Sequence, residues 1–450
     1  MACVTRVLAL DVGTSSVRAG VFGADAREPD TVRREYPDEL DPDRLVAAVR
    51  AALDEAGGGK DVDGVGTSSF GHSLIALDAR GRPLTPVLGW RDTRSADAVA
   101  ELARCVDPGV VHARTGCPLH TSFWPAKLAW LAREDPDTFR SAQRFVSFAD
   151  YLYAQLLGEG EVATSLSLAS GTGLVDLGTA AWDEELLAVL GLGVKRLPAI
   201  SDEPHGSWYP ALIDGACSNV GAGCITRTCA ALMIGTSGAF RTLYETDRPH
   251  PRRGLFLYRL DERRVVEGGA LSDGGNLYHW LGDTLGAASG SLTARDPDSH
   301  GLTFLTLLGG ERSPGWHLHA TGAIHGLTFA TTPLDLRQAA LEGVAFRFAA
   351  IAELMPEVEE VVATGGALLR DDDWLQIVAD ALGRPIIASG VQEASLRGAA
   401  VVTLERLGVT APEPPLGRQV EPRRDRAPAF RRARERQRAL YRAATGTETS

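Results

Sequence analysis

The stretch "RVLALDVGTSSVRAGVFG", residues 6–23, reads as a buried strand, a tight turn and a second strand. An apolar run leads into Asp11, a turn of glycine and small hydroxyl residues follows, and VRAGVF resumes a strand pattern. The plan repeats at residues 228–244, TCAALMIGTSGAFRTLY, where Gly-Thr-Ser-Gly again joins two apolar strands. Two such hairpins far apart in the chain predict two similar halves that face a cleft.

Helical periodicity follows each hairpin, and a mixture of strands and helices is typical of an α/β fold. The expected domain boundary lies near residues 225–230, which divides the chain into 1–226 and 227–450. The predicted helices cover residues 42–57, 95–106, 126–142, 148–159, 183–193, 336–354, 372–383, 395–408 and an exposed terminal helix within 423–444.

The size and charge of the chain limit its function. Its 450 residues exceed what one hydrophobic core supports, and 44% hydrophobic with 23% charged residues is an ordinary globular composition. The net charge of −12 disfavours nucleic acid or an anionic membrane as partner, so the tail arginines are interpreted as a solvated face. No apolar run reaches the roughly 18 residues that span a bilayer, and no signal-peptide cleavage site is present. We therefore expect a cytoplasmic protein.

The cysteines and two histidines do not indicate a metal site. Six cysteines form no CxxC pair and are expected to be buried thiols in a reducing compartment. His317 and His319 alternate as two ligands on one strand would, but no carboxylate or cysteine completes a set, which favours a loop.

Small-residue turns are the candidate nucleotide loops. A P-loop is excluded because Asp61 follows Lys60 in AGGGKD, and residues 64–69 lack the third glycine of a dinucleotide fingerprint. The turns at 11–16, 235–238 and 362–368 remain, and their backbone N–H groups suit phosphate oxygens. Asp11 at the strand end could hold Mg²⁺ through water.

A single carboxylate, Asp214, lies among small residues in LIDGACSNVGAGC, residues 212–224. Such an aspartate is a good helix N-cap, and a glycine-rich loop also lets a substrate come close enough for the carboxylate to act as general base. Two tryptophans, Trp90 and Trp316, could stack on a sugar or belong to the core, and stacking is favoured only for Trp90.

From about residue 6 to about residue 410, the chain resembles the FGGY family of carbohydrate kinases. LALDVGTSSVRAGVF and ALMIGTSGAF are similar to the family's two phosphate loops. The segment 322–342, GAIHGLTFATTPLDLRQAALE, fits the C-terminal family signature from its first small residue to Ala-Ala-Leu-Glu. The resemblance implies a two-domain actin-like ATPase (ribonuclease H-like) fold with a central interdomain cleft, and it implies that this segment helps to build the second domain.

The resemblance also implies roles for individual residues. Asp214 would be the catalytic base, Gly215 would let the sugar approach, and His72 and Trp90 would line the sugar pocket. Asp11 would contact the metal. The residues implied to contact ATP are Asp11, Gly13, Thr14, Ser15, Ser16 and Arg18 in the first loop, Thr236 in the second, and Gly275 and Gly366 around the adenosine.

Several positions depart from the family pattern. Ile213 stands where relatives have a glycine before the base, and His279 stands where some have a glutamine near the adenine. An N-terminal signature fits only partly: Lys127, Trp130 and Leu131 agree. Trp124 replaces a small residue in a stretch that borders the sugar pocket in relatives, so its bulk is expected to bear on substrate choice.

The function implied is ATP-dependent phosphorylation of a primary hydroxyl of a sugar acid, polyol or ketose, with Mg²⁺ as cofactor. Residues 117–131, 167–177 and 309–316 look most like gluconate kinases, which favours conversion of D-gluconate to 6-phosphogluconate. Xylulokinase is the alternative. A non-catalytic sugar sensor or chaperone-type ATPase is disfavoured because the chain retains Asp214. The partners expected are a small-molecule substrate and a second copy of the chain in a homodimer.

Overall fold

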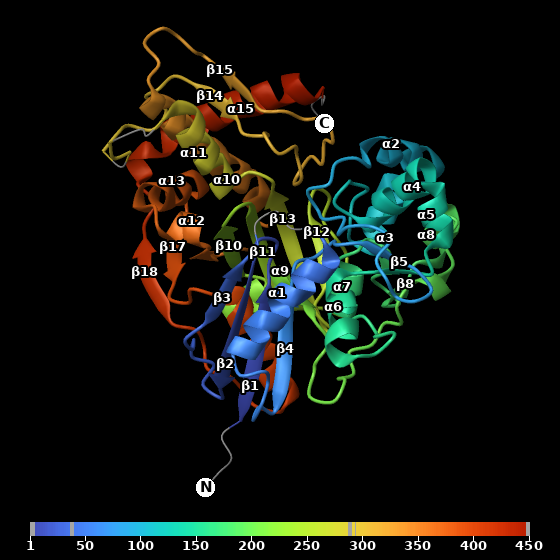
Figure 1. Ribbon diagram of the computed structural model, residues 1–450. Coiled ribbons are helices and arrows are strands. Elements are labelled where there is room, and N and C mark those ends of the chain that lie inside the picture. Colours follow the sequence, from blue (N-terminus) through green and yellow to red (C-terminus); the bar gives the residue numbers. More distant parts are fainter. Residues whose placement is uncertain (1–4, 37–39, 287–289, 293, 447–450) are drawn as a thin grey trace.

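The computed structural model describes residues 5–36, 40–286, 290–292 and 294–446, so Cys3 lies outside the described residues. Two β-sheets occupy the centre of the molecule, and helices cover their outer faces (Figure 1). The cysteines within the described ranges are free, and four of the five are buried.

The first sheet carries the N-terminal hairpin. β1 (Arg6–Val12) pairs antiparallel with β2 (Ser16–Gly23) and parallel with β4 (Gly64–Ser69), and the full order is β3-β2-β1-β4-β9. β3 spans Val32–Glu35 and β9 spans Leu212–Ile213. β1 is buried from its second residue to its last, because helices cover both faces of the sheet.

The second sheet repeats this arrangement. β10 (Cys229–Ile234) pairs antiparallel with β11 (Gly238–Glu245) and parallel with β16 (Glu360–Thr364). The order β13-β11-β10-β16-β17 reproduces the order of the first sheet, with an extra antiparallel strand at each edge. The expectation of two similar halves is therefore confirmed. The remaining strands are β12 (Phe256–Arg259), β13 (Arg264–Leu271), β17 (Ile386–Ser389) and β18 (Leu416–Val420).

A helical unit with its own hydrophobic core, formed by buried residues between Leu74 and Leu197, stands beside the first sheet. Its elements are β5 (Ile75–Leu77), α2 (Ala96–Cys105), α3 (Pro108–Thr115), α4 (Trp124–Glu134), α5 (Pro136–Ser141), β6 (Arg144–Val146), α7 (Leu166–Ser170), β7 (Val175–Asp176), β8 (Ala181–Trp182), α8 (Glu184–Val189) and η1 (Val194–Arg196). α1 (Pro42–Glu55) and α6 (Phe148–Leu157) pack together against the sheet.

The outer layer of the second half consists of helices and a short β-ribbon. Its elements are α10 (Gly275–Leu285), β14 (Thr303–Leu305), β15 (Ala323–His325), α11 (Pro333–Glu353), α12 (Gly366–Leu369), α13 (Asp372–Leu382), η2 (Arg424–Arg426) and α15 (Ala427–Thr445).

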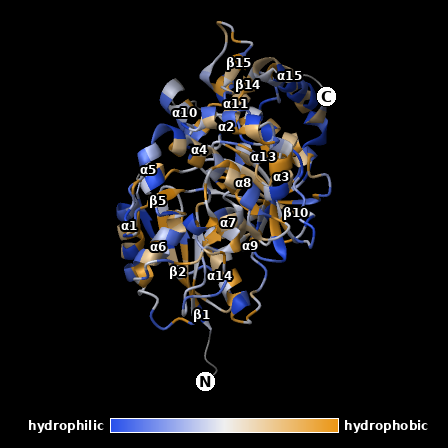
Figure 2. Ribbon diagram, turned by 90° about the vertical axis from the view of Figure 1, so that its right-hand side faces the viewer, coloured by the Kyte–Doolittle hydropathy of each residue, from blue (hydrophilic) through white to orange (hydrophobic). Residues whose placement is uncertain are grey.

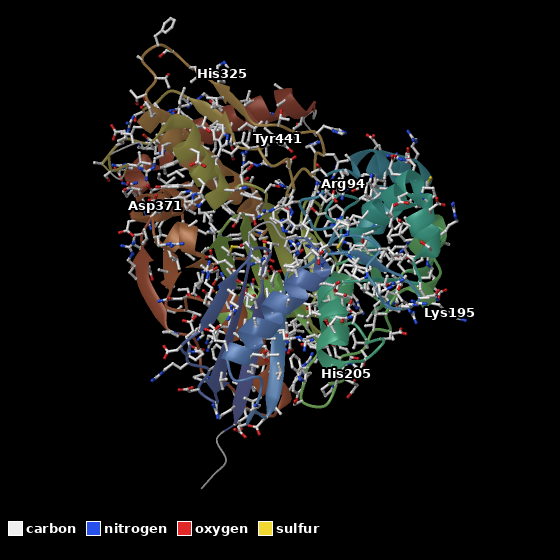
Figure 3. The ribbon with its side chains drawn as sticks, in the orientation of Figure 1. Arg94, Lys195, His205, His325, Asp371 and Tyr441 are labelled. Carbon is white, nitrogen blue, oxygen red and sulfur yellow. The ribbon has the colours of Figure 1, made fainter. Side chains whose placement is uncertain are left out.

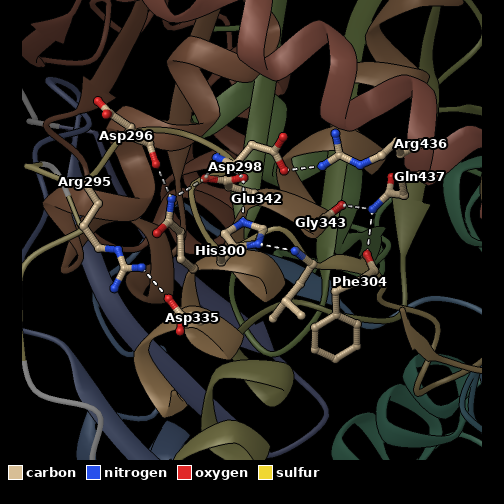
Figure 4. A network of polar contacts seen from close by, with 12 residues as sticks. Arg295, Asp296, Asp298, His300, Phe304, Asp335, Glu342, Gly343, Arg436 and Gln437 are labelled. Atoms are coloured by element: carbon tan, nitrogen blue, oxygen red, sulfur yellow. Dashed lines mark hydrogen bonds and ion pairs between the residues drawn. The ribbon is translucent and has the colours of Figure 1, made fainter. Parts of the chain in front are cut away.

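The expected C-terminal signature forms β15 and the first half of α11, and its carboxylates have structural partners. Asp335 caps α11 and pairs with Arg295, while Glu342 accepts from His300 Nε2 at 3.2 Å (Figure 4). Both Glu342 and His300 have side chains that are only 2% exposed. These bonds tie residues 295–303 to α11, which supports a building role for the signature.

Two helix predictions need correction. The helix expected over 126–142 breaks into α4 and α5 at Asp135, because Pro136 cannot continue a helix and Asp135 caps the next one. The terminal helix expected to be exposed is hydrophilic along most of its length (Figure 2), yet it buries Phe430 and Ala433 against the second-half core. Several of its arginines form ion pairs, among them Arg436 with Asp298.

No helix within the described ranges combines the length and the apolar character that a bilayer-crossing segment needs.

Helices α9 (Asp214–Gly221) and α14 (Ala394–Arg406) cross in close contact at the face of the first sheet that is turned toward the second half. α14 comes late in the sequence but packs on β1 and β4. Glycines permit the contact: a Cβ on Gly398 would lie 2.5 Å from the Cys217 carbonyl carbon, and one on Gly221 would overlap the Ala394 carbonyl group. The division at residues 226 and 227 stays a prediction, whereas packing places α14 with the first sheet.

We expect Gly398→Ala to lower the free energy of unfolding by about 1–3 kcal/mol, because the added methyl group must displace helix backbone. Gly282→Ala is the matched control: Gly282 is also inside a helix, but a Cβ there meets nothing within 4 Å. Alanine should stabilise that exposed site by up to about 1 kcal/mol. Urea unfolding followed by circular dichroism measures both, and equal midpoints for the two variants would contradict the proposed close crossing.

Candidate active site between the two sheets

Asp214 lies where the first sheet meets the second. β9 ends at Ile213, and Asp214 is the first residue of α9, so Ile213 occupies the N-cap position. The N-cap hypothesis for Asp214 is therefore wrong: its Oδ1 accepts the N–H of Gly215 at 2.8 Å, and no cap bond is formed. The carboxylate lines a cavity of about 80 Å³. Residues of both halves line the same cavity, among them His72, Trp90, Gly215, Ser237, Arg241, Tyr258 and Arg312.

The environment of Asp214 makes its carboxyl group easier to protonate than an exposed one. Burial raises its pKa above the usual value of 3.8, and the neighbouring Asp11 raises it further. The guanidinium groups of Arg241 and Arg312 and the Gly215 N–H oppose this shift. A partly desolvated carboxylate beside cations has the properties of a general base.

Arg241 and Arg312 are buried beside Asp214, with exposed fractions of 8% and 9%. The Nε atom of each is buried and without a hydrogen-bond partner, and within the described ranges neither guanidinium forms an ion pair. Burial lowers the pKa of both groups, but an arginine keeps its charge in a protein. Buried unpaired cations are costly, so this pair favours an anionic ligand in the cavity.

His72 presents a neutral imidazole to the cavity. Its Nδ1 lies 2.6 Å from the Gly171 carbonyl oxygen, which can only accept, so Nδ1 carries the proton and Nε2 is an acceptor. Burial, with the cations Arg312 and Lys127 nearby, lowers the pKa of His72 to about 3. The ring can therefore accept a hydrogen bond from a substrate hydroxyl.

Lys127 holds the backbone of His72 through a hydrogen bond. Its Nζ, on a side chain that is almost fully buried, donates to the carbonyl oxygens of His72 at 2.7 Å and Ser122 at 2.6 Å. His72 has a φ of 65°, a left-handed conformation that is strained for a residue with a side chain. The ammonium group stabilises that backbone, while burial lowers the pKa of Lys127 to about 7.

Aromatic rings form the remaining wall. Trp90 lines the cavity and lies under the Arg312 guanidinium, 5.0 Å from Cζ to the ring centroid. Tyr258 stacks on Phe256 at 4.4 Å, and its hydroxyl is buried without a partner. By contrast, Trp124 is a core residue of the helical unit, and its Nε1 donates to Ser73. It is absent from the described cavity lining, and its influence on substrate choice stays a prediction.

The segment expected to be the first phosphate loop is a tight turn at the end of β1. The N–H of Gly13 donates to the carbonyl of Ser16 at 2.9 Å, and Tyr36 donates its hydroxyl to the Gly13 carbonyl at 2.6 Å. This turn leaves Thr14 and Ser15 exposed and buries Ser16.

Asp11, at the end of β1, has polar partners on both oxygens. Ser68 donates to Oδ1 at 2.8 Å, and Arg18 donates to Oδ2 at 3.0 Å. Arg18 also pairs with Glu393, just before α14, at 2.8 Å. Each carboxylate oxygen can accept a further bond, so Asp11 fits a water-mediated contact to Mg²⁺.

The turn expected to be the second phosphate loop, residues 235–238, lies beside the N-termini of α10 and α12. Gly275, the first residue of α10, donates to the Gly235 carbonyl at 2.7 Å, and Asn276 donates to Thr236 at 3.1 Å. A Cβ on Gly275 would lie 3.0 Å from Ala367, next to Gly366 at the start of α12. Thr236, Gly275 and Gly366 are thus brought together at the carboxyl end of β10, and Thr236 is exposed there. His279 is also exposed, one turn along α10.

The two halves contribute different parts of the site. His72, Trp90, Asp214 and Gly215 line one cavity with Ser237 of the second loop. His317 and His319 lie in the loop before β15, and the Trp316 side chain donates to Gly254 and packs against the core. Sequence reasoning missed Arg241, Tyr258 and Arg312. Their residue types gave no sign of a binding role, because these side chains reach the cavity only through the packing of the two halves.

Known proteins share both halves. The model of the N-terminal domain of the FGGY family of carbohydrate kinases matches residues 6–207, and the C-terminal domain model matches residues 230–404. A gluconokinase of Bacillus subtilis (strain 168) is 29% identical over 89% of this chain and 88% of its own length.

Solved structures share the fold. A gluconate kinase from Lactobacillus acidophilus superposes with a TM-score of 0.88 at 24% identity, over 99% of each chain. A ligand-bound xylulose kinase from the same organism also gives 0.88 at 24% identity, over 98% of this chain and 99% of its own. Two repeated sheets, two small-residue loops and both family models lead to one conclusion: the chain belongs to the FGGY family of carbohydrate kinases and is an ATP-dependent sugar kinase.

Proposed function

We propose that this kinase transfers the γ-phosphoryl group of ATP to the primary hydroxyl of D-gluconate and forms 6-phosphogluconate. The proposal rests on one observation: two buried guanidinium groups, those of Arg241 and Arg312, lie beside Asp214, and among the described contacts neither forms an ion pair. With Asp214 ionised, these three groups sum to one positive charge, which complements the single carboxylate of a sugar acid. The 29% identical gluconokinase supports the same substrate.

Arg312 is the better candidate for the carboxylate. It lies over Trp90, whereas Arg241 lies close to the base: a Cβ on Gly215 would be 2.9 Å from Arg241 Nη1. In gluconate the carboxylate and the phosphorylated hydroxyl are at opposite ends of a six-carbon chain. Placing the carboxylate at Arg312 puts the primary hydroxyl toward Asp214, and His72 Nε2 and the Tyr258 hydroxyl then face the hydroxyls between.

Asp214 accepts the proton of the attacking hydroxyl. Phosphoryl transfer needs little covalent help from the protein and depends on positioning and charge neutralisation. Mg·ATP supplies the phosphoryl group, and the fitting residues are Thr14 and Ser15 in the first loop, Thr236 in the second, and Asp11 for the metal through water. Because residues of both halves line the cavity, closure of the halves over bound substrate would exclude water from ATP. The cytoplasmic location and the homodimer stay predictions.

Asp214→Asn is expected to lower kcat by about 10²–10⁴-fold, because the amide cannot accept the proton. ATP binding, measured by calorimetry, should be retained. Asp107→Asn is the matched control, since Asp107 caps α3 away from the cavity and asparagine caps as well as aspartate. Retained turnover in Asp214→Asn would remove Asp214 from the role of base.

The rate should depend on pH through Asp214. The base works ionised, so kcat/KM falls as pH falls through its raised pKa, which lies above 3.8. Arg241→Gln removes a cation that lowers this pKa, and the acidic limb of the pH–rate profile should move to higher pH. An acidic limb at the same pH in both proteins would show that Arg241 does not tune the base.

Arg312→Met is expected to raise KM for gluconate by about 10–100-fold, because a hydrogen bond to a charged group is lost. KM for xylulose, a neutral ketose, should stay within about twofold, since the contribution of Arg312 is to the carboxylate. ADP release is measured for gluconate, xylulose, ribulose, glycerol and rhamnulose. A wild-type preference for xylulose would favour the alternative kinase, and no turnover with any sugar would favour a sensor. A raised KM for ATP alone would assign Arg312 to the phosphates instead.

A further inference from the structure

Residues 311–317 form a connection whose first two side chains face opposite environments. Arg312 lines the substrate cavity, whereas the Glu311 carboxylate is fully buried on the other side. There it pairs with Arg347 of α11 and accepts the hydroxyl of Tyr441 at 2.9 Å. The anchor of Glu311 therefore fixes the backbone from which Arg312 extends.

The rest of the connection is held by backbone bonds. The N–H of Ser313 donates to Ala270 at 2.9 Å, and that of Trp316 donates to Arg312 at 2.7 Å. His120 Nδ1 accepts from the Ser122 N–H, so its Nε2 is the protonated nitrogen, and it donates to the Glu311 carbonyl at 3.1 Å. These bonds fix the main chain. Among the described contacts, Arg347, Tyr441 and the His317 N–H reach the Glu311 carboxylate, and the His317 imidazole lies 4.0 Å from it.

Tyr441 comes from the C-terminal helix, beyond residue 404, where the family model ends. Its ring lies under the Arg347 guanidinium at 4.7 Å and beside His317 at 5.9 Å. Gly315 leaves room for it, since a Cβ there would overlap the tyrosine hydroxyl. Figure 3 shows Tyr441 in the upper part of the molecule, above and to the left of Arg94, which belongs to the helical unit.

We propose that Tyr441 is a positioning residue for substrate specificity: by holding Glu311, it places Arg312 where the carboxylate of a sugar acid binds. The proposal rests on the proposed function, because it concerns the carboxylate end of that substrate. It extends the specificity determinants to α15, a helix that contributes no residue to the described cavity lining.

The test begins with Tyr441→Phe, which keeps the ring and removes one hydrogen bond. KM for gluconate should rise about threefold to tenfold, because a bond to a carboxylate is lost and its effect reaches Arg312 indirectly. kcat should stay within about twofold and KM for ATP should not change, since Asp214 and the phosphate loops keep their contacts.

A double-mutant cycle with Arg312→Met identifies the route of the effect. In the Arg312→Met background, Tyr441→Phe should not raise KM for gluconate further, because the residue through which it acts is gone. Gln437→Met is the control on the same helix: it removes the bonds from Gln437 to Phe304 and Gly343 and should lower Tm without changing KM.

Three results would overturn the proposal. Unchanged KM in Tyr441→Phe would show that Glu311 holds Arg312 without the tyrosine. Multiplying effects in the double mutant would show that Tyr441 acts elsewhere. An equal rise of the KM for gluconate in Gln437→Met would show that any destabilisation of α15 produces the effect. If the wild-type protein phosphorylates only neutral sugars, the proposed function fails as well. The ADP-release assay of the wild-type protein is therefore completed before any variant is made.

Discussion

The close crossing of α9 and α14 is the constraint on which the rest of the site depends. It brings a helix from the second half of the sequence onto the first sheet, and Gly221 and Gly398 allow backbone to lie against backbone there. Asp214 begins one of these helices, and Glu393 precedes the other and holds Arg18, the partner of Asp11. A shift of the crossing would therefore displace Asp214 and the turn at residues 11–16 together.

Local patterns in the sequence predicted the parts of the fold that local forces determine. The strands of both hairpins follow from the periodicity of their apolar residues, and the turn within each hairpin follows from its small residues. The glycine after α13 follows from the preference of glycine for the left-handed conformation that ends a helix. The packing of α14 on the first sheet could not be predicted, because helix propensity does not show which of the two sheets a helix packs against. Arg241 was missed because strand propensity does not show that β11 is buried on both faces between the two halves.

The setting of Asp214 shows why a single carboxylate in a glycine-rich segment suits proton transfer. Small neighbours let the Arg241 guanidinium come close, and a side chain at residue 215 would occupy its place. Desolvation favours the protonated acid, while the two arginines favour the ionised base. Ile213 also lines the cavity: its side chain is buried against Gly71 and Gly171, and its backbone occupies the N-cap position before Asp214.

The net charge of −12 makes the local cations necessary. ATP is an anion, and so is the sugar acid that we propose as substrate, so the field of the whole protein opposes their approach. At physiological ionic strength the Debye length is about 8 Å, and surface carboxylates beyond that distance act weakly on a bound substrate. Arg241 and Arg312 are within the cavity wall and are screened much less. These two cations therefore dominate the local field at the cavity, and in our proposal the buried ion pair of Glu311 with Arg347 keeps the neighbouring Arg312 directed at the sugar acid.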